Sequence, residues 1–478
     1  MSKFDPAFSS VLKIAHEHAL DYLEQVHQRP SQPAASLETL RKRLNKPLAD
    51  EPVAPERVVS DLVHDTEDGM LAMASGRFYG WVMGSALPAA LAADWLTSAW
   101  HQNSALHATS PAASVTEEVA GEWLKQLLHL PAQASFAFVT GCQMAHVTCL
   151  AAARRRLLLR RNWDPEQQGV FGAPPIRIIS SPQRHGSFQR AMQLLGFGQR
   201  SIVHAESDGN DRLIPAALER VLAADAEAPT IVLLQAGDVN IGAFDPFEQV
   251  IPIAKRYNAW VHVDGAFGLW AAASPKYNHL TRGVESADSW ATDGHKWLNV
   301  PFDSGYAFVA DADAHRGAFT HRAAYFSLDG DARDPMDWNP EWSRRARSFA
   351  TYAAVRQLGR RGVAEVVDRC CAHAHALVTQ IGALPGAELI WAPTLNQGLV
   401  RFLDPRPGAS EEDHDRRTDA VVAAVQAGRE AFFSPTTWRG RRAMRTSVCS
   451  WLTDEDDVRR SVAAVAEAMA SVEEMAVK

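Results

Sequence analysis

The 478-residue chain is predicted to be an α/β protein with a mostly parallel sheet and a smaller α+β domain at its carboxyl end. Between about residues 134 and 309, short β-branched or aromatic runs alternate with stretches of helical apolar spacing, which indicates repeated strand–helix–strand units. After about Arg344 the pattern changes to long helices and short strands. We therefore expect a helical arm over 1–75, a large domain over 76–343 and a small domain over 344–478.

The alternation in the large domain predicts strands with helices between them. The strands are expected over residues 135–139, 176–179, 230–234, 260–264 and 306–309, and the helices over 145–160, 188–195, 214–223 and 247–257. Helices that connect parallel strands cover both faces of the sheet, and ligands bind beyond the carboxyl ends of the strands. Those strand ends are therefore where functional residues are expected.

The two ends of the chain show other patterns. Residues 8–44 carry helical apolar spacing and a Pro-rich stretch over 47–55 follows, which predicts the helical arm. The small domain is expected to hold helices over 349–358 and 363–384, strands over 398–402 and 445–449, and a final helix from Asp454. The charge run over 411–417 is expected to be a solvated loop.

Composition limits the classes of function. A formal net charge of -8 gives no positive footprint for nucleic acid. Five cysteines without a CxxC pair argue against a disulfide framework and a metal site, and they fit a reducing cytoplasm. The first ten residues lack an apolar leader, and the apolar stretch over 81–96 is broken by Pro88 and Asp94. Neither a signal peptide nor a membrane span is expected.

The segment Asp293-Gly294-His295-Lys296-Trp297-Leu298 carries the sharpest chemical signal. A lysine between a strand end and an apolar pair is a candidate Schiff-base former, because burial disfavours the ammonium, lowers its pKa and makes the amine nucleophilic. On this motif alone, an exposed or structural Lys296 is the better interpretation. Its companions in the sequence reverse that preference.

Asp264 ends the apolar strand expected over 260–264, so its carboxylate must be paired. A carboxylate on the pyridine nitrogen of pyridoxal phosphate keeps that nitrogen protonated and makes the ring an electron sink. The alternative is an aspartate that caps the next turn. Ala266, two positions later, is small enough to lie under a flat ring.

Two further elements follow strand ends. Thr140-Gly141-Cys142-Gln143 joins a strand to a helix, and the backbone N–H groups and helix dipole at such a turn suit a phosphate monoester. A single glycine in this position is common, so the element is weak by itself. His185 lies just past the next strand, where an imidazole can stack on a flat cofactor, although a lone loop histidine is more often a surface residue.

The order of glycine turn, histidine, strand-end aspartate and His-Lys resembles the group II pyridoxal-phosphate decarboxylases, the family of aromatic-amino-acid, histidine and glutamate decarboxylases. The resemblance covers roughly residues 78–452 and includes an entry segment that begins with Arg77-Phe78-Tyr79-Gly80-Trp81-Val82 and continues to Ala89-Ala90-Leu91-Ala92-Ala93-Asp94-Trp95. It implies the aspartate-aminotransferase-like fold (fold type I), pyridoxal 5'-phosphate as cofactor, and decarboxylation of an L-amino acid to amine and carbon dioxide. It also implies a homodimer with active sites at the interface.

Residue roles follow from the resemblance. Lys296 would hold the cofactor, Asp264 would pair with its pyridine nitrogen, and His185 would stack on its ring. The residues expected around the phosphate are Gly141, Cys142, Asp293 and His295. Tyr325 stands at the spacing from the lysine at which aromatic-type members carry a tyrosine on a mobile loop, and its phenol is expected to reprotonate the α-carbon. The alternative for Tyr325 is packing at the base of that loop.

Departures from the family pattern leave the substrate open. Cys142 stands in place of a glycine or serine, Met144-Ala145-His146 in place of Glu-Ala-Asn, and Gly237-Asp238-Val239 in place of Gly-Thr-Thr. The last change removes two hydroxyls near the phosphate. The segment Trp81-Val82-Met83 indicates a partly apolar substrate pocket, which mildly favours an aromatic or other bulky side chain.

Two other classes of function remain open. The first is a pyridoxal-phosphate aldolase, transaminase or aldehyde-forming oxidative decarboxylase on the same fold, which product analysis separates from a simple decarboxylase. The second is a catalytically silent or nucleotide-binding α/β protein. That second class gives no reason for Lys296 and Asp264 to stand at strand ends.

Overall fold

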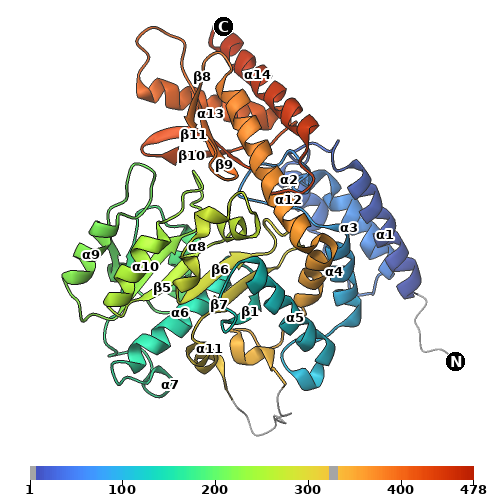
Figure 1. Ribbon diagram of the computed structural model, residues 1–478. Helices are drawn as coiled ribbons and strands as arrows, with labels where there is room; N and C mark the ends of the chain where they lie inside the picture. The colour runs from blue at the N-terminus through green and yellow to red at the C-terminus, as the bar shows by residue number, and fades with distance from the viewer. Residues whose placement is uncertain (1–6, 322–331, 478) are drawn as a thin grey trace, which may run out of the picture.

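The computed structural model describes residues 7–321 and 332–477 (Figure 1). Its large sheet has seven strands in the order β1-β7-β6-β5-β4-β2-β3. These strands are β1 Ser135–Val139, β2 Arg177–Ser180, β3 Ile202–His204, β4 Thr230–Gln235, β5 Trp260–Asp264, β6 Ser289–Asp293 and β7 Gly305–Val309. β7 pairs antiparallel with β1 and β6, and the other pairs are parallel. The carboxyl ends of the six strands other than β7 therefore meet at one edge of this sheet.

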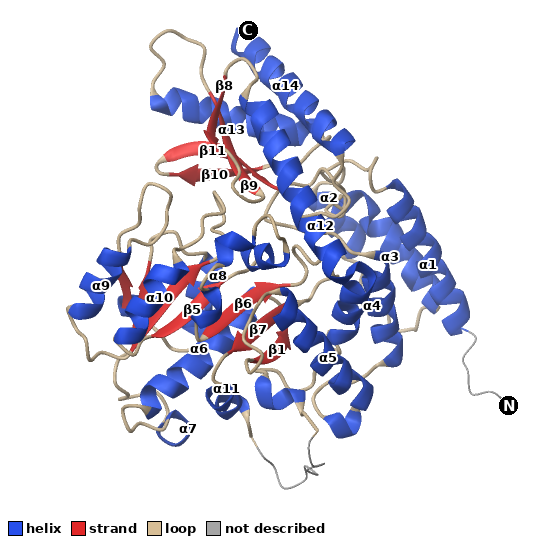
Figure 2. Ribbon diagram, viewed as in Figure 1, coloured by secondary structure: helices blue, strands red, loops and turns tan. Residues whose placement is uncertain are grey.

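Side chains of the large sheet alternate between two apolar cores. Ile231 and Leu233 of β4 pack into the core beneath α6 and α8, whereas Val232 and Leu234 pack into the core that includes α5, α9 and α10. A strand sends successive side chains to opposite faces, so helices cover both faces as predicted (Figure 2). The helices of this part are α4 Pro88–Trp100, α5 Pro111–Leu127, α6 Cys142–Leu159, α7 Pro165–Gln168, α8 Gly186–Leu194, α9 Pro215–Ala223, α10 Phe247–Arg256 and α11 Ala312–Phe319.

The structure confirms the predicted fold class and each strand predicted in the large domain, with ends that differ by at most one residue. It also contains β3 and β6, which the sequence pattern does not predict. β3 has only three residues. β6 reads Ser-Trp-Ala-Thr-Asp and is buried along its whole length, so its polar side chains hide the apolar pattern by which a buried strand is recognised.

The small domain is built on an antiparallel sheet of four strands in the order β10-β11-β9-β8. Its strands are β8 Ala387–Trp391, β9 Gln397–Phe402, β10 Ser434–Trp438 and β11 Arg441–Ser447, and its helices are α12 Ser348–Gly382, α13 Glu411–Gly428 and α14 Glu455–Val477. Figure 2 shows this sheet, α13 and α14 above the large sheet, with α12 running down from them toward α4. The domain boundary at residue 344 stays a prediction.

α12 joins the two parts of the molecule. Gly359, with φ 58° and ψ -178°, interrupts the helix, and the two predicted helices over 349–358 and 363–384 are its halves. In the first half, Phe349 packs edge-on against Trp100 of α4 with ring centroids 5.1 Å apart. In the second half, Val378 packs beside Gly398 of the small sheet.

The charge run over 411–417 starts α13 and is not a loop. The hydroxyl of Ser410 accepts the N–H of Asp413 at 3.2 Å, and the carboxylate of Asp413 accepts the N–H of Ser410 at 2.8 Å. This reciprocal cap satisfies amides that the first turn leaves unpaired, and acidic residues there also favour the helix dipole. The prediction of a loop is wrong because the cap at Ser410 turns the same charges into a helix start.

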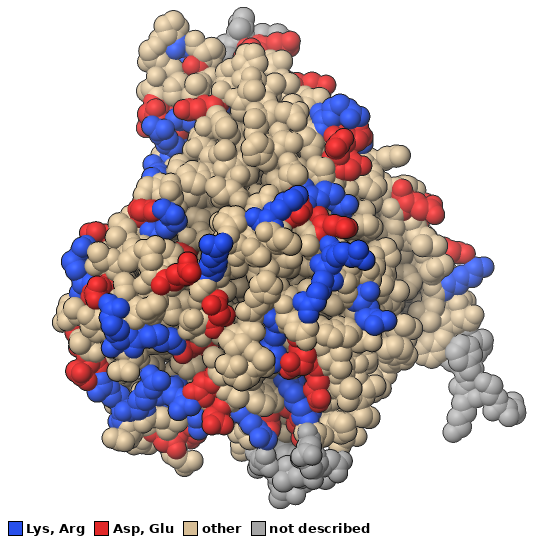
Figure 3. All heavy atoms as spheres, in the orientation of Figure 1, with Lys and Arg blue, Asp and Glu red and all other residues tan. Residues whose placement is uncertain are grey.

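The amino-terminal arm consists of α1 Ala7–Gln25, α2 Leu37–Leu44 and α3 Pro55–Thr66. Figure 1 shows it along one flank of the molecule, beside α4. α1 buries no residue in the chain described here. No helix in the described ranges 7–321 and 332–477 is long and apolar enough to cross a membrane. On the face drawn in Figure 3, cationic and anionic side chains are interspersed among the described residues.

Asn299 ties three segments together behind the Lys296 turn. Its side-chain oxygen accepts the backbone N–H groups of Ser85 (2.9 Å) and Trp451 (3.1 Å). Its amide group donates to the carbonyls of Trp297 (2.8 Å) and Cys449 (3.2 Å). The side chain is 1% exposed, so water cannot replace these partners. One amide therefore connects the entry segment, the lysine turn and the small domain.

We predict that Asn299→Ala destabilises the protein strongly. Four backbone groups lose a buried partner, and the free energy of unfolding is expected to fall by about 3 kcal/mol or more, measured by denaturant unfolding. Asn258→Ala is the matched control, because Asn258 has nearly the same left-handed backbone (φ 54° against 53°) but is exposed. Equal losses of unfolding free energy in the two variants would show that the loss comes from the left-handed backbone of the position and not from the missing amide.

Candidate active site

A cavity of about 1140 Å³ lies at the carboxyl edge of the large sheet. Every predicted site residue that the structure describes lines it: Trp81, Val82, Met83, Gly141, Cys142, His185, Asp264, Ala266, Asp293, His295 and Lys296. The small domain adds a wall that includes Phe432, Ser434, Pro435 and Arg445. Tyr325 lies outside the described residues. The cavity thus brings together groups that come from separate strand ends.

Lys296 lies just after β6, in the turn that Asn299 holds. Its ammonium is 3.2 Å from the carboxylate of Asp293, and its side chain is 18% exposed. Gly84 of the entry segment passes so close that a Cβ there would lie 1.9 Å from the Lys296 carbonyl oxygen. Only glycine permits this approach, which keeps the lysine turn against the entry segment.

The expected pKa shift of Lys296 has the opposite sign in the structure. Burial lowers the pKa of the ammonium, but the carboxylates of Asp293 and Asp264 outweigh it and raise the pKa above its ordinary value. The prediction of a lysine made nucleophilic by burial is therefore wrong for the protein alone. It failed because the sequence pattern does not reveal that Asp293 points at the amine.

Asp264, at the end of β5, keeps its carboxylate ionised. One oxygen accepts the N–H of Ala266 (3.2 Å), and the other is 3.5 Å from Nε2 of His146. Burial alone would raise the pKa of Asp264, but the His146 imidazole, which also donates a hydrogen bond to it, and the positive charge of Lys296 hold that pKa well below its usual range. A buried anion facing a cavity suits a cationic partner such as a protonated ring nitrogen.

The turn at Gly141 joins β1 to α6. A Cβ at Gly141 would lie 3.2 Å from Cε1 of His295, so a side chain there would press on the cavity wall. Asp293 accepts the N–H of Cys142 at 2.6 Å, and Gln143 and Met144 of the first helical turn also line the cavity. First-turn amides without helical partners favour an anion such as a phosphate.

Two histidines lie at the cavity on different sides. His185 caps α8, with its Nδ1 accepting the N–H of Ser187 at 3.2 Å, and removal from water lowers its pKa while Asp264 opposes that shift. His295 accepts the N–H of Ser304 at 3.2 Å, and its ring packs against Phe302 with centroids 4.4 Å apart. Burial lowers the pKa of His295 as well, although Asp293 opposes this. Both shifts favour the neutral imidazole over the imidazolium.

Sequence reasoning missed two charged or polar residues of this site. Arg445 of β11 is 8% exposed, and its Nε has no hydrogen-bond partner among the described residues. Its signal was a charge at the start of the strand predicted over 445–449. His146 of α6 touches Asp264 from behind the cavity wall, and its signal was the departure from a family asparagine.

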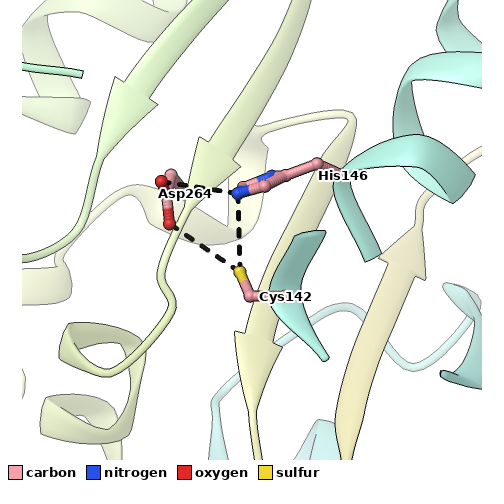
Figure 4. A group of neighbouring side chains, drawn as sticks. All are labelled: Cys142, His146 and Asp264. Carbon is pink, nitrogen blue, oxygen red and sulfur yellow. Dashed lines mark hydrogen bonds and ion pairs between the residues drawn. The ribbon is translucent and has the colours of Figure 1, made fainter. Parts of the chain in front are cut away.

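The cavity fits pyridoxal phosphate on its own chemistry. It offers an amine at Lys296, an anion at Asp264, small or flat neighbours in Ala266 and His185, and a helix start at Gly141. Cys142, His146 and Asp264 also place ligand-type atoms within 4.8 Å of one another (Figure 4). Burial raises the pKa of the Cys142 thiol well above its usual value. Asp264 of this group faces the same cavity as Lys296, and we assign its carboxylate to the cofactor.

Comparisons with known proteins agree with this site. The pyridoxal-dependent decarboxylase conserved domain matches residues 38–403. The chain is 27% identical to the aromatic-L-amino-acid decarboxylase of Drosophila melanogaster, over 97% of this chain and 92% of that one. It is 29% identical to tryptophan decarboxylase 1 of Oryza sativa subsp. japonica, over 94% and 91%.

Solved structures agree as well. The crystal structure of Oryza sativa TDC with PLP and tryptamine covers 99% of each chain, with a TM-score of 0.90 at 25% identity. The resemblance seen in the sequence is confirmed, with its fold type and its cofactor. The chain belongs to the pyridoxal-dependent decarboxylase family.

Proposed function

We propose that this decarboxylase acts on an L-amino acid with an aromatic or other bulky side chain and releases the amine and carbon dioxide. The observation that carries this proposal is a single cavity that joins Lys296 and Asp264 to an apolar and aromatic wall. Bound pyridoxal phosphate supplies a conjugated ring that withdraws electrons from the substrate α-carbon. The chain's own residues must hold that ring, orient the substrate and manage protons.

The residues beside the ring are assigned separate tasks in this proposal. Lys296 supplies the amine that binds the cofactor covalently, and Asp264 keeps the ring nitrogen protonated. His185 and Ala266 flank the ring, and the turn at Gly141 receives the phosphate. Asp293 stays a predicted phosphate neighbour, but its bonds to Cys142 and Lys296 suggest that it orients those two groups instead.

The preference for a bulky substrate rests on the wall opposite the sheet. Trp81 and Phe432 lie with ring centroids 4.9 Å apart, and Phe432 stacks on Phe78 at 4.6 Å. Met83 and Pro435 extend the apolar lining. Aromatic surfaces favour flat apolar side chains by burial and ring stacking.

Arg445 is the proposed partner of the substrate's carboxylate. Burial lowers the pKa of its guanidinium, yet arginine stays charged near neutral pH, and its Nε lacks a partner among the described groups. A guanidinium binds a carboxylate through paired N–H donors and so orients it. The substrate would then be held by its carboxylate at one end and its side chain at the other.

We predict that purified enzyme with added pyridoxal phosphate releases carbon dioxide and the matching amine from aromatic L-amino acids, faster than from acidic ones. The measurement is a screen of common L-amino acids with product analysis. Aldehyde with ammonia as the main product would replace this proposal by the oxidative reaction, and a keto acid would replace it by transamination.

Lys296→Ala serves as the control in the same screen and should reduce release to background. Borohydride reduction of the loaded enzyme followed by peptide mapping should place the cofactor on Lys296. A cofactor label found on a different lysine would contradict the proposed role of Lys296.

We predict that Tyr325→Phe binds cofactor and substrate normally but forms amine more slowly, by about 10²-fold or more if the phenol delivers the proton to the α-carbon. Oxygen-dependent aldehyde with ammonia should rise, because the α-carbon waits longer for its proton. The measurement is the ratio of amine to aldehyde with and without oxygen. An unchanged rate of amine release would leave packing as the only role of Tyr325 and make His185 the next proton donor to test.

We also propose a homodimer that buries the arm, in a reducing cytoplasm that suits five free, buried cysteines. The arm patch, defined as Leu12, Val58, Leu62 and Trp95, has side chains 43–60% exposed on α1, α3 and α4. α1 and α3 contact each other, and His16 of α1 meets Trp95 edge-on at 6.1 Å. Exposed apolar patches of this kind mark association surfaces. Gln32 and Leu71 of the arm line the cavity, so a partner seated here would lie near the active site.

We predict that Leu62→Asp shifts the protein from dimer to monomer and lowers activity, because a charge in an apolar interface is costly to bury. Light scattering after size-exclusion chromatography measures the mass. Leu194→Asp on α8 is the control, since Leu194 is exposed to a similar degree (62% against 56%) away from the arm. A wild-type monomer, or equal effects of both variants, would contradict the arm as the interface.

A further inference from the structure

A row of buried polar side chains runs from the interior to Asp264. Nε1 of Trp260 donates to Oγ of Ser289 at 2.9 Å, and that oxygen is 2.9 Å from Nδ1 of His262. Nε2 of His262 is 2.9 Å from Nδ1 of His146, whose Nε2 is 3.5 Å from Oδ2 of Asp264. Figure 4 shows His146 reaching Asp264 from α6. The row connects two strands and a helix to the carboxylate in the cavity.

The inner end of the row is compatible with one direction of its hydrogens. An indole N–H only donates, so Ser289 accepts from Trp260, and its own hydroxyl hydrogen can be given to Nδ1 of His262. Burial lowers the pKa of His262 to about 3, so His262 is neutral and carries one hydrogen. With Nδ1 accepting from Ser289, that hydrogen is on Nε2 and points at His146.

The outer end requires the same direction. If His146 instead gave its hydrogen to His262, its Nε2 lone pair would face the buried carboxylate of Asp264 at 3.5 Å. Two acceptors facing each other without water are costly. His146 and His262 are both 0% exposed, so no solvent can repair that arrangement.

We propose that Trp260, Ser289, His262 and His146 form a one-way hydrogen-bond relay that ends in an N–H on Asp264. The relay keeps the Asp264 carboxylate ionised and aimed at the ring nitrogen of the cofactor. His146 is thus a positioning residue, and it takes over a place where the family pattern carries asparagine. The inference rests on the proposed role of Asp264 in the decarboxylase.

Packing holds the relay in one arrangement. The His146 ring meets Phe188 and His262 edge-on, with centroids 5.5 Å and 5.2 Å apart. Phe188 in turn lies against His262 at 6.0 Å. These contacts hold both imidazole planes, so exchanging the tautomer requires moving hydrogens rather than rings. Cys142, 3.5 Å from Nε2 of His146, is a weak partner at the same nitrogen and does not reverse the direction.

The test compares two ligands of the cofactor-free enzyme: pyridoxal phosphate, and an analogue in which a C–H group replaces the ring nitrogen. Absorbance or fluorescence titration gives the affinity for each. His146→Leu should lower the affinity for pyridoxal phosphate by about tenfold or more, which is the size of a hydrogen bond to a charged group. The affinity for the analogue should change by less than about twofold. An equal loss of affinity for both ligands would show that the role of His146 is purely structural and would overturn the relay.

Two further variants sharpen the test. Ser289→Ala, which removes only one hydroxyl and does not touch Asp264, should weaken pyridoxal phosphate selectively but less than His146→Leu does. His315→Leu is the matched control, because His315 is also 0% exposed and bonds to Ser135 (2.8 Å) and Trp338 (2.9 Å) away from Asp264. It should not alter the ratio of the two affinities. If His315→Leu lost affinity for pyridoxal phosphate but not for the analogue, the relay would be contradicted. A wild-type enzyme that binds no pyridoxal phosphate would overturn the proposed function as well.

Discussion

The carboxamide of Asn299 is the interaction on which the rest of the site depends. Parallel strands can bring polar groups to one edge of a sheet, but they do not determine how the lysine turn meets the segments above it. Asn299 does this by bonding backbone groups of the entry segment, of its own turn and of the small domain. The close passage of Gly84 over the Lys296 carbonyl completes the contact. The cavity therefore has walls from three parts of the chain in one fixed relation.

The pKa values of Lys296 and Asp264 in the cavity depend more on their charged and hydrogen-bonding partners than on burial. Lys296 is opposed by Asp293 and Asp264, so the protein alone favours the charged ammonium, and its deprotonation must accompany the arrival of a ligand that changes this balance. Asp264 remains an anion in a buried place because donors and positive charges surround it. The site is thus prepared for a cation at Asp264 and for an anion at the helix start beside Gly141.

Much of this could be predicted from sequence, and the failures have physical causes. The strand end at Asp264 was found because a charge after an apolar run is a local signal, and Lys296 was found from the segment around it. Asn299 and the histidine relay could not be found in that way, since their partners lie far away along the chain. β6 was missed because its buried polar residues are paired only in the folded state. The start of α13 was missed because Asp413 belongs both to the charge run and to the helix cap with Ser410. The role of Tyr325 stays a prediction.

The break in α12 has a mechanical consequence. Helical hydrogen bonds stiffen each half, and the first half is seated on α4 while the second carries the small sheet. The two halves are therefore anchored separately, and the chain changes direction between them at Gly359, where ψ is -178°. A side chain at this position would meet no neighbour within 4 Å, but the positive φ of 58° favours glycine. The break thus lets each half of one helix follow the part of the molecule against which it packs.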